Sequence, residues 1–172
     1  MGKTRVLITL GCCVIAMASV AMAQGTPKPG LWESTTTMNF AQSPLPPGMT
    51  APSGSPFSGA PRTMQVCVTQ AQIDRFGGPN PLPSHGNCSA TDVQKTLTGM
   101  TANLVCTGQM TGNGTVVIKW SDTGTGTSTV HFSGNMQMGQ KSSPVEFTVH
   151  TDSVYKGADC GSVKPLNLPS GN

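Results

Sequence analysis

The feature that most constrains the fold is a series of short segments in which apolar and polar residues alternate. Apolar side chains recur every second residue in each segment, which is the period of a β-strand with one buried face. Glycine, asparagine and aspartate separate the later segments at spacings that fit tight turns. Short connections join antiparallel neighbours, because parallel strands need long crossovers. Eight strands are expected, at residues 30–40, 63–69, 91–97, 101–108, 114–121, 127–134, 144–151 and 153–157.

One short helix is expected between the second and third strands. Thr69 and Gln72 have the spacing of a capping box, in which each side chain satisfies a backbone amide beside the other residue. A helix of two turns should follow at residues 70–76 and end at Gly77 and Gly78. The whole pattern predicts a mainly all-β protein, an antiparallel meander that forms a curled sheet or half-open small barrel, with one short helix.

Residues 41–62 differ in composition from the rest of the chain. They contain six prolines, three glycines and four serines, which cannot sustain a helix or a central strand. A surface insertion in the domain is the expectation. The alternative is a lid or a partner-docking segment, anchored by Leu45, Met49 and Phe57.

The first 23 residues have the composition of a secretory signal peptide. Lys3 and Arg5 precede an apolar run, and a small-x-small site ends at Ala23. We expect cleavage between Ala23 and Gln24, which leaves residues 24–172 as a single domain. No later segment approaches the roughly 20 apolar residues of a membrane span. The sequence therefore predicts a periplasmic or secreted protein without a transmembrane span, and we expect a monomer.

Two alternatives concern the N-terminus and the charge. Lipid attachment at Cys12 or Cys13 is possible in principle, but the residues before them fit an attachment motif poorly. Without Lys3 and Arg5, eight basic residues face seven acidic ones, a net charge of +1. Nothing in this balance forms the cationic surface that nucleic acid requires, so no nucleic-acid partner is expected.

Four cysteines remain after the signal segment: Cys67, Cys88, Cys106 and Cys160. An even number in an exported chain predicts two disulfide bonds. Loop-closure entropy does not choose among the three pairings, since their totals are similar. We prefer Cys67–Cys88 with Cys106–Cys160, because the first pair would close a local loop and the second would clamp the late strands. The cysteines contain no C-x-x-C motif and the histidines do not cluster, so no metal site and no cofactor are expected.

Catalytic groups are sparse. His85 lies in a Pro/Gly-rich loop, whereas His131 and His150 alternate with the apolar residues of their strands and should face solvent. The chain has no G-x-S-x-G motif for a strained nucleophilic serine. Glu33 and Glu146 are the least implausible pair of acids for a glycosidase. Solvated strand carboxylates are the simpler interpretation, and no catalytic residue is predicted.

The methionine pair in "MQM" raises one metal alternative. Met136 and Met138 share a strand face, with Met110 and His131 not far away in the sequence. Thioethers bind Cu(I) in oxidising compartments. A core strand would show the same pattern, because methionine is a flexible filler of cores, and core packing is favoured.

Several short motifs together resemble a known family. They are Pro29-Gly30-Leu31-Trp32-Glu33, Cys67-Val68-Thr69 with Gln72, Cys88, Cys106-Thr107-Gly108, and Gly157-Ala158-Asp159-Cys160. In this order and spacing they resemble the bacterial exported family called domain of unknown function 3617, over nearly all of the chain after the signal segment. The basic residues usual before the last motif are reduced here to Lys156. The resemblance implies export and fold, and it implies no activity.

Three classes of function remain open. The first is a non-enzymatic binding module, in which a concave apolar face holds a small apolar or lipid-like ligand. Its candidate ligand-binding residues are Trp32, Trp120, Phe132 and Phe147, although Trp32 is expected above all to anchor the core. The second class is an envelope-associated interaction module that docks a protein partner through residues 41–62 or a sheet edge. The third is a hydrolase.

Overall fold

The computed structural model describes residues 27–45, 48–52, 54–76 and 87–165. The expected signal segment with Cys12 and Cys13, the glycines expected to end the helix, and His85 lie outside these residues. Within them, no helix is long and apolar enough to cross a membrane. The elements in chain order are β1 (Gly30–Gln42), η1 (Pro56–Ser58), β2 (Arg62–Val68), α1 (Gln70–Phe76), β3 (Asn87–Lys95), β4 (Gly99–Thr107), β5 (Met110–Trp120), β6 (Thr125–Met138) and β7 (Lys141–Gly157).

The strands form one antiparallel sheet in the order β2-β1-β7-β6-β5-β4-β3. Strands β3 to β7 are the predicted meander, in which each strand pairs with the next one along the chain. The connection between β2 and β3 carries the chain from one edge of the sheet to the other, because β1 pairs with β7. The sheet therefore has two edges, β2 and β3, that do not pair with each other.

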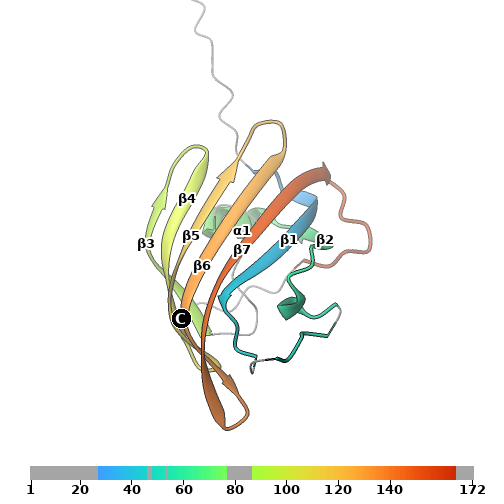
Figure 1. Cartoon of the computed structure of the whole chain (residues 1–172). Helices are drawn as coiled ribbons and strands as arrows, with labels where there is room; N and C mark the ends of the chain where they lie inside the picture. Colours follow the sequence, from blue (N-terminus) through green and yellow to red (C-terminus); the bar gives the residue numbers. More distant parts are fainter. Residues whose placement is uncertain (1–26, 46–47, 53, 77–86, 166–172) are drawn as a thin grey trace, which may run out of the picture.

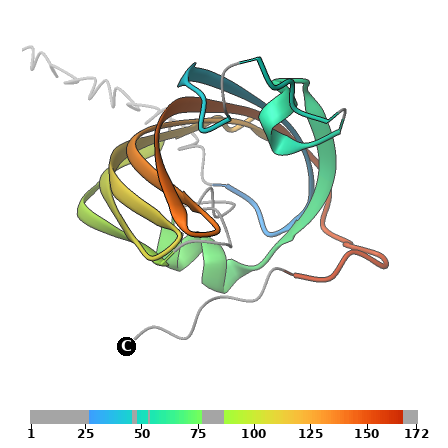
Figure 2. The same cartoon turned by 60° about the horizontal axis from the view of Figure 1, so that its bottom comes forward.

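The sheet curls into an open ring, and α1 lies between the two edge strands (Figures 1 and 2). The Lys95 ammonium at the end of β3 donates to the Asp74 carbonyl oxygen of α1 over 2.8 Å. The capping box that begins α1 is formed as expected: the Thr69 amide donates to Gln72 Oε1 over 2.7 Å, and the Gln72 amide donates to Thr69 Oγ1 over 3.2 Å. The prediction of a half-open, mainly β fold with one short helix is confirmed.

The expectation of eight strands was wrong by one. Residues 144–151 and 153–157, expected as separate strands, belong to the single strand β7 of 17 residues. Asp152 looks like a turn residue in the sequence, but its side chain points outward and the alternation continues unbroken to the buried Ser153. A polar residue on the solvent face of a strand does not end the strand.

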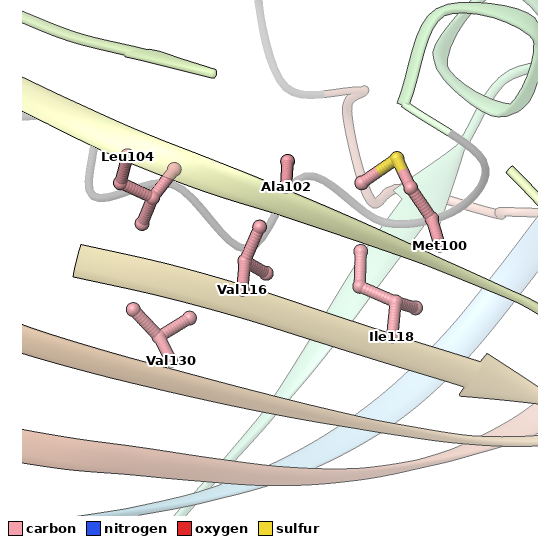
Figure 3. Packing of buried hydrophobic residues seen from close by; sticks show 6 residues of the cluster. All are labelled: Met100, Ala102, Leu104, Val116, Ile118 and Val130. Atoms are coloured by element: carbon pink, nitrogen blue, oxygen red, sulfur yellow. The ribbon is translucent and has the colours of Figure 1, made fainter. Parts of the chain in front are cut away.

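Two apolar clusters cover the concave side of the sheet, which we call the inner face. The first consists of Met100, Ala102, Leu104, Val116, Ile118 and Val130 on β4, β5 and β6 (Figure 3). The second consists of Cys106, Phe132, Val145 and Phe147 on β4, β6 and β7. Residues directly opposite in an antiparallel ladder share a face, so the inner face can be followed from strand to strand through the register.

Two disulfides are present, but the preferred pairing was wrong. Cys67 bonds Cys160 with 5.5 Å between Cα atoms, and Cys88 bonds Cys106 with 3.9 Å. Cys67 and Cys88 lie on β2 and β3, the opposite edges of the sheet, so the expected local staple cannot form. Cys88 and Cys106 face each other in the register of β3 and β4. Cys160 follows β7, and Pro165 just beyond it forms a bridge with Cys67.

The Pro/Gly/Ser-rich insertion runs from the end of β1 to the start of β2 and contains the single turn η1. Of its three expected apolar anchors, Phe57 packs against Phe40, with ring centroids 5.8 Å apart. Leu45 is half-buried and Met49 is 65% exposed. Only part of the insertion thus contributes an anchor to the inner face.

Candidate ligand-binding site on the inner face

Four phenylalanines form a continuous row across the inner face. Phe57 contacts Phe40, Phe40 lies 5.8 Å from Phe147, and Phe147 lies 5.3 Å from Phe132 in a stacked arrangement. Phe40, Phe147 and Phe132 sit in register on β1, β7 and β6, which explains why their rings meet. Aromatic pairs of this kind add about 0.5–1.5 kcal/mol beyond the area they bury.

The Phe132 ring lies over two glycines that face each other on β5 and β6. A Cβ atom at Gly112 would come within 2.9 Å of Phe132 Cζ, and one at Gly134 within 3.0 Å. The backbone at these positions forms the bed of the ring, so a side chain at either glycine would displace it. The glycines of β5 and β6 therefore serve packing as well as chain geometry.

A small apolar cavity of about 40 Å³ lies beside these rings. Six of the seven strands contribute to its lining, all except β2. The lining residues are Met38, Cys88, Leu104, Cys106, Met110, Val130, Phe132, Phe147 and Val149. Every lining side chain is apolar or belongs to the Cys88–Cys106 disulfide, so the cavity offers no polar partner to a ligand.

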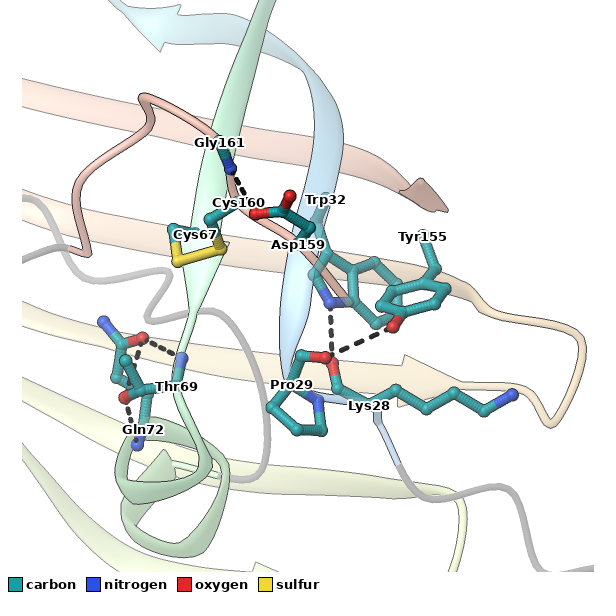
Figure 4. The surroundings of a disulfide bond; sticks show 10 residues. All are labelled: Lys28, Pro29, Trp32, Cys67, Thr69, Gln72, Tyr155, Asp159, Cys160 and Gly161. Atoms are coloured by element: carbon teal, nitrogen blue, oxygen red, sulfur yellow. Dashed lines mark hydrogen bonds between the residues drawn. A yellow bond between two sulfur atoms is a disulfide. The ribbon is translucent and has the colours of Figure 1, made fainter. Parts of the chain in front are cut away.

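Trp32 anchors the opposite end of the inner face. Its indole N–H donates to the Lys28 carbonyl over 2.9 Å, and its ring meets Tyr155 edge-on at 5.4 Å (Figure 4). The tyrosine hydroxyl donates to the Pro29 carbonyl over 3.3 Å. Trp32 is only 2% exposed. These contacts are those of the expected core anchor.

Trp120 lines a second, more open pocket of about 290 Å³ at the ends of β4 and β5. Its indole N–H donates to the Leu97 carbonyl over 3.0 Å, and Met100 and Ile118 lie beside it in the lining. The rest of this lining consists of Thr96, Thr98 and Gly99 at the start of β4 and of the outward-facing side chains of Thr101, Val117 and Lys119. The pocket is therefore part of the rim of the sheet.

The structure thus separates the four candidate ligand-binding residues. Phe132 and Phe147 line the apolar cavity, Trp120 lines the rim pocket, and Trp32 lines neither of these two. Met38, Val149 and the Cys88–Cys106 disulfide also line the cavity and were not predicted as ligand-binding groups from the sequence. The parity of Met38 with Trp32 could have indicated the first of them, but the disulfide depended on knowing the pairing.

Hydroxyl side chains occupy the part of the inner face between Trp32 and the apolar cavity. Ser34 and Ser153, both buried, share a hydrogen bond of 2.8 Å between their Oγ atoms. Thr36 and Thr151, one register step further, share one of 3.0 Å. In each pair one hydroxyl donates to the other, so β1 and β7 bury these side chains with a hydrogen-bond partner for each.

The outer face brings three potentially catalytic groups together on β6 and β7. Thr129 Oγ1 lies 3.3 Å from His150 Nδ1, and His150 Nε2 lies 3.3 Å from Asp152 Oδ1. This is the order of groups in a nucleophile–histidine–carboxylate site. The groups stand on an exposed strand surface, and the backbone amides of these central strands are directed into the sheet ladder, so none is aimed outward as an oxyanion donor. The arrangement lacks the geometry of a hydrolase.

The carboxylates proposed as a glycosidase pair are far apart. Glu33 lies opposite Val154 in the β1–β7 register, and Glu146 precedes Val154 on β7 by eight residues. At about 3.3 Å per residue the two are separated by roughly 26 Å, against the 5–10 Å that a glycosidase requires. Glu33 is paired with Lys156 at 3.3 Å and remains 39% exposed. Glu146 is paired with His131 at 3.3 Å. Both histidines in the described strands face solvent, as expected.

Three of the sequence motifs meet around the Cys67–Cys160 disulfide (Figure 4). The Thr69–Gln72 capping box follows Cys67, and the Asp159 carboxylate accepts from the Gly161 amide over 2.9 Å beside Cys160. Gly30, at the start of β1, packs so closely on the end of β7 that a Cβ atom there would collide with the Gly157 carbonyl. These motifs fasten β2 and the start of β1 to the segment that follows β7, which is a structural role.

The comparisons with known proteins agree with this arrangement. Residues 27–160 match the family described as "Protein of unknown function (DUF3617)". Searches of curated proteins and of solved structures gave no significant match. The match spans more than half of the chain and includes all four cysteines of the two disulfides. The chain therefore belongs to the DUF3617 family.

Proposed function

We propose that the protein is a non-enzymatic binding module that takes a small apolar or lipid-like ligand against its inner face. The observation that carries the proposal is the apolar cavity to which six strands contribute. A curled sheet that directs apolar side chains from nearly all its strands to one point is the arrangement that small barrels use for such ligands. The two disulfides favour an oxidising compartment, and we place the protein in the periplasm or outside the cell.

The cavity is too small to hold a ligand unless some of its lining side chains move. Sites for small molecules measure roughly 300–1,000 Å³, whereas this cavity holds about 40 Å³. Met38 and Met110 line it, and methionine side chains change rotamer easily and repack around different shapes. An acyl chain or a small ring would enter by displacing these two side chains, while the packed rings of Phe132 and Phe147 stay in place.

Val149 offers a direct test, because it lines the cavity and is half-buried. In Val149→Phe the larger side chain should occupy the cavity and lower the affinity for a fluorescent probe such as 1-N-phenylnaphthylamine or a dansylated fatty acid at least tenfold. Val154→Phe is the matched control, since Val154 lies on the same strand and points outward with 48% exposure.

The control should bind the probe as the wild type does, and thermal unfolding should show that both variants are folded. Wild-type protein that binds neither probe would refute the proposal. Equal loss of binding in both variants would place the ligand elsewhere.

A further inference from the structure

Three methionines gather at the end of the inner face furthest from Trp32. Met110 begins β5, and Met136 and Met138 end β6, beside the β6–β7 hairpin (Figure 1). Met110 and Met136 are directly opposite in the register. Met138 lies two residues beyond Met136 on the same face, which makes it a diagonal neighbour of Met110. Such positions have Cβ atoms about 5 Å apart when opposite and 7–8 Å when diagonal, within the reach of three flexible thioether side chains.

The floor of this methionine group is aromatic. The next register step inward is the glycine pair Gly112 and Gly134, over which the Phe132 ring extends toward the methionines. Met110 and Met136 pack against the cluster that contains Phe132. The faces of the ring lie on the glycines and against Phe147, so its edge is directed toward the methionines and its bulk excludes water from the inner side.

Exposure distinguishes these methionines from an ordinary core residue. Met100 is 5% exposed inside its cluster, whereas Met138 is 37% exposed and Met110 and Met136 are half-buried. Met110 and Met136 thus lie between solvent and the cluster that contains Phe132, and Met138 lies on the solvent side of them. A small ion could reach them without opening the sheet.

Ligand chemistry then selects the ion. Thioethers are soft, neutral ligands that prefer Cu(I) to hard cations, which need oxygen. All four cysteines of the described residues are bonded in disulfides, so no thiolate among them competes for a soft ion. We propose that Met110, Met136 and Met138 form a binding site for one Cu(I) ion through their three sulfur atoms. Met110 also lines the apolar cavity, so the two proposals share this residue, but the Cu(I) site does not require an apolar ligand.

The first test is a competition titration with Cu(I) held by bicinchoninate. The disulfide-intact full chain is treated beforehand with N-ethylmaleimide, which blocks Cys12 and Cys13. One Cu(I) per chain should be withdrawn from the chelator. Met110→Leu and Met136→Leu should each weaken binding at least tenfold, and leucine nearly conserves the volume of methionine, so folding should be retained. Met64→Leu is the matched control, because Met64 lies on β2, is 54% exposed and is remote from the group.

A second measurement does not depend on any variant. Silver(I) is a redox-stable substitute for Cu(I), and its addition should shift the methyl NMR signals of Met110, Met136 and Met138 and leave those of Met49 and Met64 unchanged. Failure to withdraw Cu(I), or binding that survives both leucine substitutions, overturns the proposal. Methyl shifts at Met49 and Met64 in place of Met110, Met136 and Met138 would also overturn the proposal.

Discussion

The two halves of the inner face exclude water by different means. On β4, β5 and β6 the buried side chains are purely apolar, and Leu104, Val116 and Phe132 are each 2% exposed or less. On β1 and β7 the inner face between Trp32 and Met38 is built from paired hydroxyl groups. The apolar half gains stability from area and packing, whereas the hydroxyl half is neutral only while every partner is present. The apolar half should therefore tolerate apolar side chains of similar volume, whereas the hydroxyl half should tolerate only changes that leave no hydroxyl without its partner.

Each half is also closed by its own disulfide, and removal of these bonds should give the largest effects. Cys67–Cys160 spans 93 residues at the hydroxyl half, and Cys88–Cys106 spans 18 at the apolar half. Loop entropy predicts losses of about 4.7 and about 3 kcal/mol for their double alanine variants. Urea unfolding of Cys67→Ala/Cys160→Ala and Cys88→Ala/Cys106→Ala measures both, and a larger loss for the shorter loop would contradict this account.

Deletion of a ring should have an effect comparable to the loss of the shorter disulfide loop, confined to the apolar half. Phe132→Ala removes a fully buried ring from the phenylalanine row and enlarges the cavity beside it. We expect a loss of about 3–5 kcal/mol in the free energy of unfolding. Phe57→Ala, at the half-buried end of the same row, is the control and should cost clearly less. Equal losses would contradict the assignment of different burial to the two ends of the row.

The smallest effect is expected in the hydroxyl half, where it has a distinctive form. Ser34→Ala leaves the buried Ser153 hydroxyl without its partner and should cost about 1–3 kcal/mol. The double variant Ser34→Ala/Ser153→Ala removes both polar groups and should recover part of that loss. Chemical denaturation of the two single variants and the double variant closes the cycle. Strictly additive losses would mean that the pair contributes no coupling.

Much of the fold was predictable because alternation with a period of two is a local property. The parity of Trp32, Met38 and Phe40 assigned the inner face of β1 correctly, and the spacing of Thr69 and Gln72 located the start of α1. The continuity of β7 was missed for the same local reason, since Asp152 has the chemistry of a turn residue. Local chemistry does not report which strand neighbours which.

The features that could not be predicted from the sequence are those that depend on the order of the strands in the sheet. The disulfide pairing follows from the placement of β2 and β3 at opposite edges, and that placement depends on β1 choosing β7 as its neighbour. The cavity has the same origin, because Met38 reaches Cys88 and Leu104 only after the sheet has curled. Phe132 and Phe147 were identified from composition and parity, but their partners in the lining required the three-dimensional arrangement.

The pairing of β1 with β7 also determines the order in which the strands can assemble during folding. The first strand to be synthesised must wait for the last, because its partners on β7 lie far along the chain: Thr36 pairs with Thr151, 115 residues later. Strands β3 to β7 can assemble from consecutive hairpins, each with a nearby partner. Until β7 is complete, Trp32 and Phe40 on β1 lack the β7 surface that covers them in the folded sheet, so the chain holds these two aromatic side chains uncovered early in its formation.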